Sequence, residues 1–526
     1  MLGRRGLVLV LLAGVLACTA APAQAQATFA ARAVVRVDHP GAVIAADVHG
    51  QFSEFLGRGI YEGLWVGEGS AIPNTRGWRN DVVAALRELG VPVIRWPGGC
   101  YADRYHWRDG IGPRTQRPVR LNQTWGGAEE SNAVGTHEFM DLVEQLGARA
   151  YINANVGTGA PQEAADWLEY MTSDTNSALA QERRRNGREQ PWRVAYWALG
   201  NELWQCGGNM RPEHYADLYR HFATFMWAPN DRRPVLVAAG AYDTDTAWTR
   251  ALMANIPLEL VGAITLHHFS LPTGSWSGAK GPATGFGEAD WFSIMRRAHA
   301  MDGYIRAHDA IMNRADPEQR VGLYVDEWSN WYDVEPGHPG SSLYQQNTLR
   351  DAVTAAVNLN IFHAHADRVR MANITQMVNV LQAMVLTDGL RMLRTPTYHV
   401  FRLYRPFQGA HMLPVEMHAP AYRYEGQATP SLSLSAALDA DGVVHIGLAN
   451  MDPSRAAGVE VTLRGLDQGG VSGQILTADA MDAHNTFDQP DALTPRPFAG
   501  ARWEGARLLI EAPAKSVIVL ALTPSR

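Results

Sequence analysis

The sequence predicts an α/β fold, a parallel (β/α)8 TIM barrel followed by a C-terminal all-β sandwich. Three observations lead to this prediction. The chain has 526 residues, too many for one ordinary core and about right for a barrel plus a second module. Between about residues 45 and 375, apolar strand-like runs alternate with one-sided helical stretches. After about residue 410 the pattern changes to short strands separated by Gly, Pro and Asp.

The barrel is predicted from eight apolar runs that are continuous, as expected for parallel strands buried on both faces. The helical stretches between them, such as 81–89, 137–146 and 213–226, have apolar residues at i, i+3 or i+4. An open doubly wound sheet is the competing topology, but no dinucleotide or phosphate fingerprint follows the first strand. The expected strands are 48–52, 92–96, 150–153, 194–199, 235–238, 263–266, 323–325 and 368–371.

The C-terminal part is expected to form the sandwich. Its strand candidates are 431–438, 443–450, 459–466 and 516–522, with the hairpin pair Asp441-Gly442 between the first two. Residues 32–37 also alternate, so this early segment is expected to return and join the sandwich. The expected domains are a signal peptide at 1–25, an N-terminal strand segment at 28–44, the barrel at 45–405 and the sandwich at 406–526.

The N-terminus has the composition of a secretory signal peptide. Arg4 and Arg5 precede an apolar run at 7–17, and small-residue cleavage sites follow at 23–27. We therefore expect export to the periplasm or the extracellular space. A lipoprotein anchored through Cys18 is the less favoured alternative, because Leu16 fits a lipobox poorly. No other stretch is long and apolar enough to span a bilayer.

Composition narrows the classes of partner. The net charge of −7 and the pI near 6.2 argue against a nucleic-acid partner. Of three cysteines, Cys18 would leave with the signal peptide, so the mature chain would keep Cys100 and Cys206. Two cysteines cannot make a tetrahedral zinc site alone, and no His-x-x-x-His pair accompanies them. We expect no metal and no other cofactor.

Two glutamates give the first indication of chemistry. Glu202 ends an apolar run within 197–204, and Glu327 ends another within 323–331. Paired carboxylates of this kind suit glycoside hydrolysis, with one as proton donor and the other as nucleophile or base. A structural ion pair or a helix cap is the alternative for each glutamate alone. Because both are followed by Trp-rich stretches, we favour the catalytic interpretation.

Polar residues also converge on one end of the predicted barrel. In parallel barrels the active site lies at the C-terminal ends of the strands. The turn after the second strand contains Gly98 and Gly99, which we expect to adopt backbone conformations that other residues avoid. The polar residues that end or follow the expected strands are Glu54, Asn153, Asn155, Asn201, Glu202, His267, His268, Asp326, Glu327, Asn373 and Gln376.

Four segments, at 50–63, 95–113, 197–210 and 325–332, resemble the α-L-arabinofuranosidases of glycoside hydrolase family 51, within the clan A retaining glycosidases. The resemblance implies an exo-acting enzyme that releases terminal α-L-arabinofuranosyl side chains from arabinoxylan, arabinan or their oligosaccharides. Glu202 would be the general acid/base and Glu327 the nucleophile. Similar proteins are commonly hexamers, so a homo-oligomer is expected. The implied substrate-binding residues are Glu54, Cys100, Trp125, Asn201, His267, Phe269, Trp331 and Gln376.

Two of these positions depart from the pattern of some family members. Cys100 stands where others have an asparagine that contacts the sugar, and Phe269 stands where a tyrosine hydroxyl is expected near the nucleophile. We therefore do not expect the asparagine's contact with the sugar or the tyrosine's oxygen donor near the nucleophile, but neither change affects the two glutamates.

Cys100 and Cys206 each follow an expected strand end on the same face, after the second and the fourth strand. In an exported chain we expect them to form a disulfide beside the pocket. Two inert buried thiols are the alternative.

Two other functions compete with the one that the resemblance implies. Another clan A glycosidase, such as an endo-acting β-glycanase, would use the same glutamates in a long cleft. A non-catalytic carbohydrate-binding protein on a degenerate barrel would not need both glutamates, and both are present.

Overall fold

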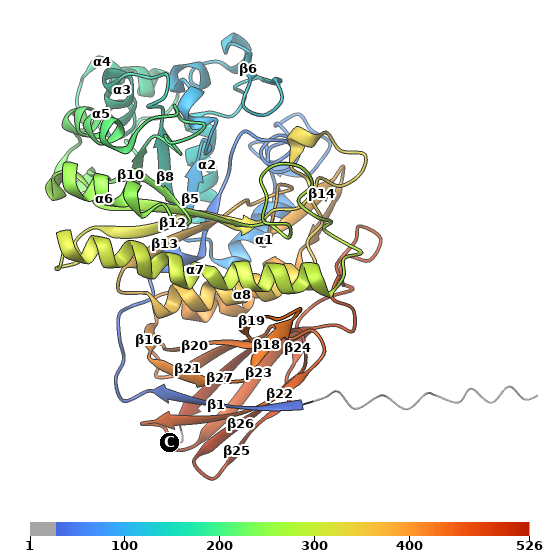
Figure 1. Ribbon diagram of the computed structural model, residues 1–526. Helices are drawn as coiled ribbons and strands as arrows, with labels where there is room; N and C mark the ends of the chain where they lie inside the picture. Colours follow the sequence, from blue (N-terminus) through green and yellow to red (C-terminus); the bar gives the residue numbers. More distant parts are fainter. Residues whose placement is uncertain (1–27, 525–526) are drawn as a thin grey trace, which may run out of the picture.

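The computed structural model describes residues 28–524, and a closed barrel of parallel strands lies at its centre (Figure 1). The ring closes in the order β10-β11-β12-β13-β2-β5-β8-β9, which confirms the TIM barrel and excludes the open sheet. The barrel strands are β2 (Gly50–Phe52), β5 (Val93–Trp96), β8 (Arg149–Ala154), β9 (Tyr196–Leu199), β10 (Val235–Tyr242), β11 (Ala263–Ser270), β12 (Gly322–Asn330) and β13 (Val369–Ile374).

Several of these strands extend further than the apolar runs predicted. β11 was expected to end at residue 266 but continues to Ser270, and β12 continues past residue 325 to Asn330. The reason is that backbone pairing does not stop at the first polar side chain: His267 is still paired with Glu327 in the ladder between β11 and β12. The polar residues of these two strands therefore lie inside the strand ends rather than beyond them.

Helices surround the barrel. The three that the apolar spacing predicted, α1, α2 and α5, begin one residue earlier than expected and end within one residue of it. The α-helices are α1 (Asn80–Leu89), α2 (Thr136–Leu146), α3 (Pro161–Thr172), α4 (Ala178–Arg185), α5 (Pro212–Phe225), α6 (Thr246–Asn255), α7 (Glu288–Ala315), α8 (Leu349–Ala364) and α9 (Pro396–Tyr404). The short 3-10 helices are η1 (Ala46–His49), η2 (Ala102–Arg104), η3 (Trp107–Gly110), η4 (Arg114–Gln116), η5 (Asn230–Arg232), η6 (Leu258–Leu260), η7 (Gly340–Ser342) and η8 (Arg405–Phe407).

The C-terminal part forms two packed, mainly antiparallel sheets, and the first described strand belongs to one of them. β1 (Thr28–Arg36) alternates between buried and more exposed residues and pairs in parallel with β22. The first sheet has the order β17 (Val415–His418), β1, β22 (Ala456–Arg464), β26 (Arg507–Ala512) and β25 (Ala501–Glu504). The second has the order β16 (His411–Leu413), β20 (Leu432–Leu438), β21 (Val444–Asn450), β27 (Ser516–Pro524), β23 (Gly469–Thr477) and β24 (Arg496–Pro497).

Short two-stranded sheets lie outside the barrel and the two sheets of the sandwich. They are β3 (Asn74–Thr75) with β4 (Trp78–Arg79), β6 (Arg120–Asn122) with β7 (Ala128–Glu130), β14 (Val385–Asp388) with β15 (Arg391–Arg394), and β18 (Ala421–Tyr424) with β19 (Gln427–Pro430).

Helices α7 and α8 lie between the barrel strands and the sandwich (Figure 1). Nearly all of α8 is buried, because the barrel covers one side and the sandwich strands β20 and β21 cover the other. Polar groups at this contact are paired: Asn360 Nδ2 donates to Ser433 Oγ at 3.1 Å, and Tyr404 donates to Asn360 Oδ1 at 2.9 Å. Within residues 28–524, no helix has the length and apolarity needed to cross a membrane.

Candidate active site

A cavity of about 510 Å³ opens at the C-terminal ends of the barrel strands. Eight of the predicted site residues line it: Glu54, Cys100, Trp125, Glu202, Phe269, Glu327, Trp331 and Gln376. Sequence reasoning missed a second set, which is mostly aromatic or apolar and, apart from Tyr242 at the end of β10, comes from the loops: Leu56, Trp204, Gln205, Tyr242, Trp276, Leu343, Thr375 and Leu381.

The two catalytic candidates meet across this cavity. Glu202 lies in the turn after β9 with a φ of 44°, a left-handed conformation that is unfavourable for a residue with a side chain. Glu327 lies within β12. Both side chains are largely buried, and an oxygen of Glu202, an oxygen of Glu327 and a ring nitrogen of His267 lie within 4.8 Å of one another.

Arg95 on β5 holds the nucleophile candidate in place. Its Nη1 donates to Glu327 Oε1 at 2.6 Å, and its Nη2 donates to Asn201 Oδ1 at 2.6 Å. Its Nε lies 3.1 Å from Asp326 Oδ2. Burial acts to lower the pKa of Arg95, but the carboxylates of Asp326 and Glu327 raise it above its ordinary value. Arg95 therefore stays cationic. The sequence placed Arg95 in the expected strand 92–96, but no role was predicted for it.

His267 on β11 contacts Glu202, the second catalytic candidate. Its Nδ1 is 2.8 Å from Glu202 Oε1, and its Nε2 is 3.1 Å from Asp326 Oδ1. Burial alone would lower the pKa of His267, but Glu327, Asp326 and Glu202 raise it to about 10. The ring is therefore an imidazolium at neutral pH and donates to Glu202 Oε1 and to Asp326 Oδ1.

The charge on Glu327 follows from opposing effects. Burial raises the pKa of the Glu327 carboxyl group, and the neighbouring Glu202 raises it further, whereas His267 and Arg95 lower it. On balance the pKa of Glu327 stays above its ordinary value, so the two cations offset only part of the cost of ionising Glu327 in a buried site. Asp326 also belongs to this network: burial raises its pKa, but Arg95 and His267 lower it below its ordinary value.

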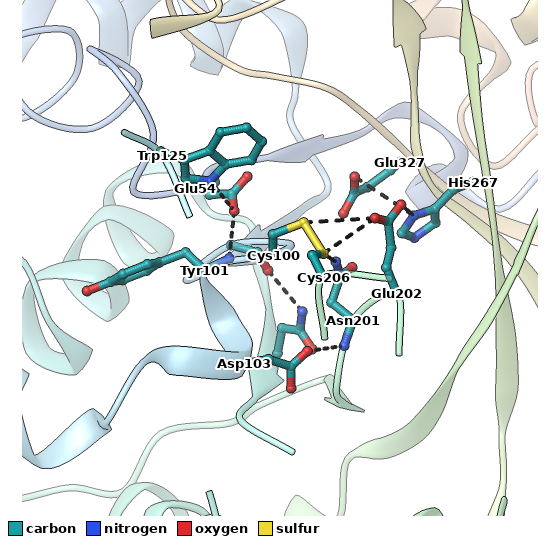
Figure 2. Close-up of a disulfide and its surroundings, with 12 residues drawn as sticks. Glu54, Cys100, Tyr101, Asp103, Trp125, Asn201, Glu202, Cys206, His267 and Glu327 are labelled. Atoms are coloured by element: carbon teal, nitrogen blue, oxygen red, sulfur yellow. Dashed lines mark hydrogen bonds and ion pairs between the residues drawn. A yellow bond between two sulfur atoms is a disulfide. The ribbon is translucent and has the colours of Figure 1, made fainter. Parts of the chain in front are cut away.

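Glu54, which follows β2, forms the opposite side of the site with its own donors. Tyr101 N–H donates to Glu54 Oε1 at 3.0 Å, Trp125 Nε1 donates to the same oxygen at 3.1 Å, and Gln376 Nε2 donates to Oε2 at 3.3 Å. Burial and the charge of Glu327 raise the pKa of Glu54 to about 7. In Figure 2 the disulfide lies between this group and the pair of Glu202 and His267.

The two glycines after β5 are required for a reason other than the predicted one. We expected unusual backbone angles, but neither glycine is among those with positive φ. The constraint is space: a Cβ on Gly99 would lie 2.5 Å from Glu327 Oε1, and one on Gly98 would lie 2.7 Å from Glu54 Cγ. These glycines let the two carboxylates approach the loop backbone.

Cys100 and Cys206 form a disulfide, with their Cα atoms 5.5 Å apart. Glu202 Oε2 lies 3.5 Å from the Cys206 sulfur and 3.9 Å from the Cys100 sulfur (Figure 2). Because a disulfide sulfur carries no hydrogen, these are packing contacts rather than hydrogen bonds. The bridge therefore packs directly against the acid/base candidate.

Two predicted substrate-binding residues, Asn201 and His267, are not among those that line the cavity. Both are buried and contact charged residues of the site instead, namely Arg95 and the carboxylates of Glu202 and Asp326.

Asp103 was also missed as a functional residue. It accepts from the backbone N–H groups of Val156, Gly157 and Asn201, each at 2.8 Å, and so fixes the loop that carries Glu202. Burial raises the pKa of Asp103 to about 7, although these N–H donors act to lower it. Backbone contacts of this kind leave no mark in the sequence.

Two groups of side chains in the described part of the chain have the spacing of metal ligands. One is Cys100 with Glu202 and Cys206, and the other is Glu202 with His267 and Glu327. In the first group the sulfurs are bonded to each other and are not thiolate ligands. In the second, His267 is cationic, whereas a metal-binding histidine is neutral. We assign no metal to either group.

Two family models match the chain: the "Alpha-L-arabinofuranosidase 1 domain" over residues 85–272 and the "Alpha-L-arabinofuranosidase C-terminal domain" over residues 326–516. A relative from Bacteroides ovatus, an "Intracellular exo-alpha-L-arabinofuranosidase", is 44% identical over 96% of this chain and 98% of its own length.

Solved structures agree with these matches. The GH51 arabinofuranosidase from Xanthomonas axonopodis pv. citri has a TM-score of 0.93 and 50% identity, covering 94% of this chain and 100% of that one. The α-L-arabinofuranosidase from Thermotoga maritima, solved as an arabinose complex, has a TM-score of 0.83 and 26% identity with the same coverage.

The prediction of export is contradicted. The Bacteroides ovatus relative matches nearly the whole chain and is described as intracellular. The expectation depended on a short charged and apolar pattern at 1–25, which lies outside the described residues, as does Cys18 of the lipoprotein alternative. Such a pattern is local, whereas the match extends over 504 residues. The disulfide prediction used export as a premise, but the two cysteines are paired in the structure.

The level of identity and the coverage are decisive for the family. A 44% match over 96% of the chain extends through both the barrel and the sandwich, and the structural match at 50% identity covers 94% of it. The chain belongs to the α-L-arabinofuranosidases of glycoside hydrolase family 51.

Proposed function

We propose that the protein is an exo-acting α-L-arabinofuranosidase that uses Glu202 as general acid/base and Glu327 as nucleophile. Its substrates would be terminal α-L-arabinofuranosyl side chains of arabinoxylan, arabinan or their oligosaccharides. The observation that carries the proposal is the meeting of these two buried carboxylates within 4.8 Å. Retaining glycosidases have their carboxyl groups about 5–5.5 Å apart, against about 6.5–9.5 Å in inverting ones.

In the first step, a Glu327 oxygen bonds to the anomeric carbon while the bond to the leaving oxygen breaks. Glu202 gives its proton to that leaving oxygen. Arg95 donates to Glu327 at 2.6 Å and so fixes the direction of attack. His267 is cationic and donates to Glu202 at 2.8 Å, which stabilises the carboxylate that remains after the proton leaves.

In the second step, Glu202 acts as a base. It takes a proton from water, the water oxygen bonds to the anomeric carbon, and the bond to Glu327 breaks. Two inversions at the same carbon give net retention. The free sugar leaves, and Glu202 is protonated again for the next cycle.

An exo-acting enzyme needs a site that closes around one terminal sugar. Glu54, with its donors Trp125 and Gln376, would bind ring hydroxyls on one side of the cavity. The Cys100–Cys206 disulfide would bound the site next to Glu202, because its sulfurs lie 3.5 and 3.9 Å from that carboxylate. Sugar hydroxyls are well matched by a mixture of carboxylate, amide and indole groups.

Proton NMR of the first sugar released from an aryl α-L-arabinofuranoside tests the proposal. We expect the α-anomer to appear first and to mutarotate later. A β-anomer as first product would refute the assigned roles. In parallel, turnover of linear xylan but not of the arabinofuranoside would favour the endo-acting alternative.

A homo-oligomer, with a hexamer as the first expectation, stays a prediction. Analytical ultracentrifugation of the purified protein gives the mass of the assembly, and a mass of 57.7 kDa, that of one chain, would contradict it.

A further inference from the structure

The cavity has more room than one pentofuranosyl unit needs. Its volume of about 510 Å³ lies within the range of about 300–1,000 Å³ that is typical of sites for drug-sized ligands. The group that leaves in the first step must lie next to the residue that protonates it. The remaining space beside Glu202 is therefore where the rest of the substrate would lie.

The wall on this side is aromatic. Tyr242 at the end of β10 and Trp204 after β9 contact each other with their ring centroids 5.8 Å apart. Trp276, in the loop 271–287 between β11 and α7, contacts Tyr242 with a centroid distance of 5.8 Å. These residues line the same cavity as Glu202.

Trp276 is held in place yet remains accessible. It packs edge to face against Phe269 with centroids 5.9 Å apart, and against Trp331 with centroids 5.2 Å apart. Together with Tyr242, three rings fix its orientation, but 48% of its surface is exposed. A large aromatic residue that is orientated by its neighbours and left half exposed at a cavity mouth is suited to stacking on a ligand.

We propose that Trp276 is the platform of a leaving-group subsite that stacks on a pyranosyl sugar of the polymer backbone, as in arabinoxylan. The inference rests on the proposed function and deepens it, because it assigns the part of the substrate that Glu202 protonates. Trp276 is a specificity-determining residue and takes no part in bond making.

The choice of a pyranosyl sugar follows from shape. A xylosyl ring in its chair form presents a broad face of C–H groups, which packs well against a flat indole. An arabinofuranosyl ring is puckered and smaller, so it offers less flat area to the same surface. Burial of apolar area is the main gain in such a contact, so the flatter ring gains more.

The test compares three substrates with Trp276→Ala. They are α-L-arabinofuranosyl fluoride, which has no sugar in the leaving group, a xylotriose that carries one arabinofuranosyl branch, and linear α-1,5-arabinotriose. We expect kcat/KM on the branched xylotriose to fall about tenfold more than on the fluoride, mainly through KM. The loss on arabinotriose should lie close to the loss on the fluoride.

Two further variants make the result specific. Trp276→Phe keeps a flat ring and should recover most of the kcat/KM on branched xylotriose. Trp227→Ala is the matched control: this tryptophan is 68% exposed and follows α5 at the opposite end of the barrel, so the three substrates should be affected alike. Thermal melting of each variant checks that the fold is intact.

An equal loss of kcat/KM on all three substrates would overturn the subsite, since it would indicate a structural role for Trp276. An equal loss on the two oligosaccharides, beyond that on the fluoride, would overturn the pyranosyl assignment. If the unaltered enzyme turned over none of the three substrates, the proposed function itself would be refuted.

Discussion

The two ends of the barrel bury ionisable groups in opposite ways. At the C-terminal end, the carboxyl groups of Glu54, Glu202, Asp326 and Glu327 lie around two cations, Arg95 and His267, and all of these carboxyl groups except that of Asp326 line a cavity. At the N-terminal end, Asp47 is ion-paired with Arg149 and hydrogen-bonded to Tyr196, with no excess of carboxylates among these groups. Near it, His49 and His363 stack with their ring centroids 5.4 Å apart.

The difference teaches what separates a stabilising polar cluster from a reactive one. Burial alone does not make the distinction, because Asp47 and Asp326 are equally inaccessible. What differs is the balance of charge: one cation per carboxylate at one end, and a surplus of carboxylates beside a cavity at the other. A surplus of like charge shifts pKa values and lets a proton move between states of similar energy.

Loss of Glu327 should have the largest effect. Glu327→Ala removes the proposed nucleophile, so kcat should fall by about 10⁴-fold or more on every substrate. Asp47→Asn is the matched change at the other end of the barrel, and it should lower the melting temperature while kcat stays within about threefold. Steady-state kinetics and thermal melting distinguish the two. If Asp47→Asn abolished turnover as well, the contrast between the ends would be wrong.

Glu202→Ala should be less damaging and dependent on the substrate. General acid–base catalysis contributes about 10²–10⁴-fold, and a good leaving group does not need a proton. The first step should therefore survive on activated aryl arabinofuranosides, and azide should rescue the second step by replacing activated water. Product analysis for arabinofuranosyl azide checks this. Rescue of neither glutamate variant, or equal defects on activated and natural substrates, would mean that the roles are misassigned.

The disulfide should stabilise the C-terminal end of the barrel. It closes a loop with a sequence separation of 106, for which the chain-entropy model gives on the order of 4 kcal/mol. Cys206→Ser should lower the free energy of unfolding by up to that amount, as measured by chemical denaturation. Thiol titration of the unfolded, unreduced protein provides the control. Two titratable thiols from Cys100 and Cys206 would show that the bridge is absent in the protein as purified.

His49 should weaken the fold in acid. Burial lowers its pKa to about 3, while an unfolded histidine titrates near 6.5. The unfolded state then binds the proton first, so the contribution of His49 to stability is present above about pH 6.5 and is lost as the pH falls toward 3. Its full size is on the order of 4 kcal/mol. His49→Gln should flatten this acid limb in denaturation curves taken across the range, and an unchanged slope would contradict the prediction.

Glu54 should act in the opposite sense. Its folded pKa of about 7 lies above the unfolded value of 4.5, so the folded state holds the proton longer. The stabilising contribution of Glu54 is therefore present below about pH 4.5 and is lost as the pH rises through 7. Its full size is on the order of 3 kcal/mol. Glu54→Gln should be relatively more stable at pH 8 than at pH 4.5. If the free energy of unfolding of Glu54→Gln changed with pH in the same way as that of the unaltered protein, the prediction and its contrast with His49 would be wrong.

The barrel could be predicted because its strands are buried on both faces, which leaves continuous apolar runs such as 194–199 in the sequence. The location of Glu202 and Glu327 at one end of the barrel could be predicted because each follows such a run. The ends of β11 and β12 could not, because their pairing continues through polar residues. The role of Arg95 was hidden too, since its three partners come from β12 and from the loop after β9.

Side chains delivered by loops were also beyond prediction. Trp276 lines the cavity because of the course that the loop 271–287 takes. A loop has no regular spacing of residues from which this course could be predicted. The expectation of export failed for the opposite reason. There the local pattern at 1–25 was clear, but the relative that matches nearly the whole chain is described as intracellular.

The parallel pairing of β1 with β22 has a consequence for synthesis on the ribosome. Thr28 is synthesised long before its partner Ala456. Until its two neighbours β17 and β22 have been made, β1 lacks its place in the sheet and has an apolar face, which is prone to associate with other chains. The sandwich therefore cannot be completed before β22 has been made. It follows that a gene fragment encoding the C-terminal part alone would yield a sheet without one of its inner strands, so the two parts are not exchangeable modules.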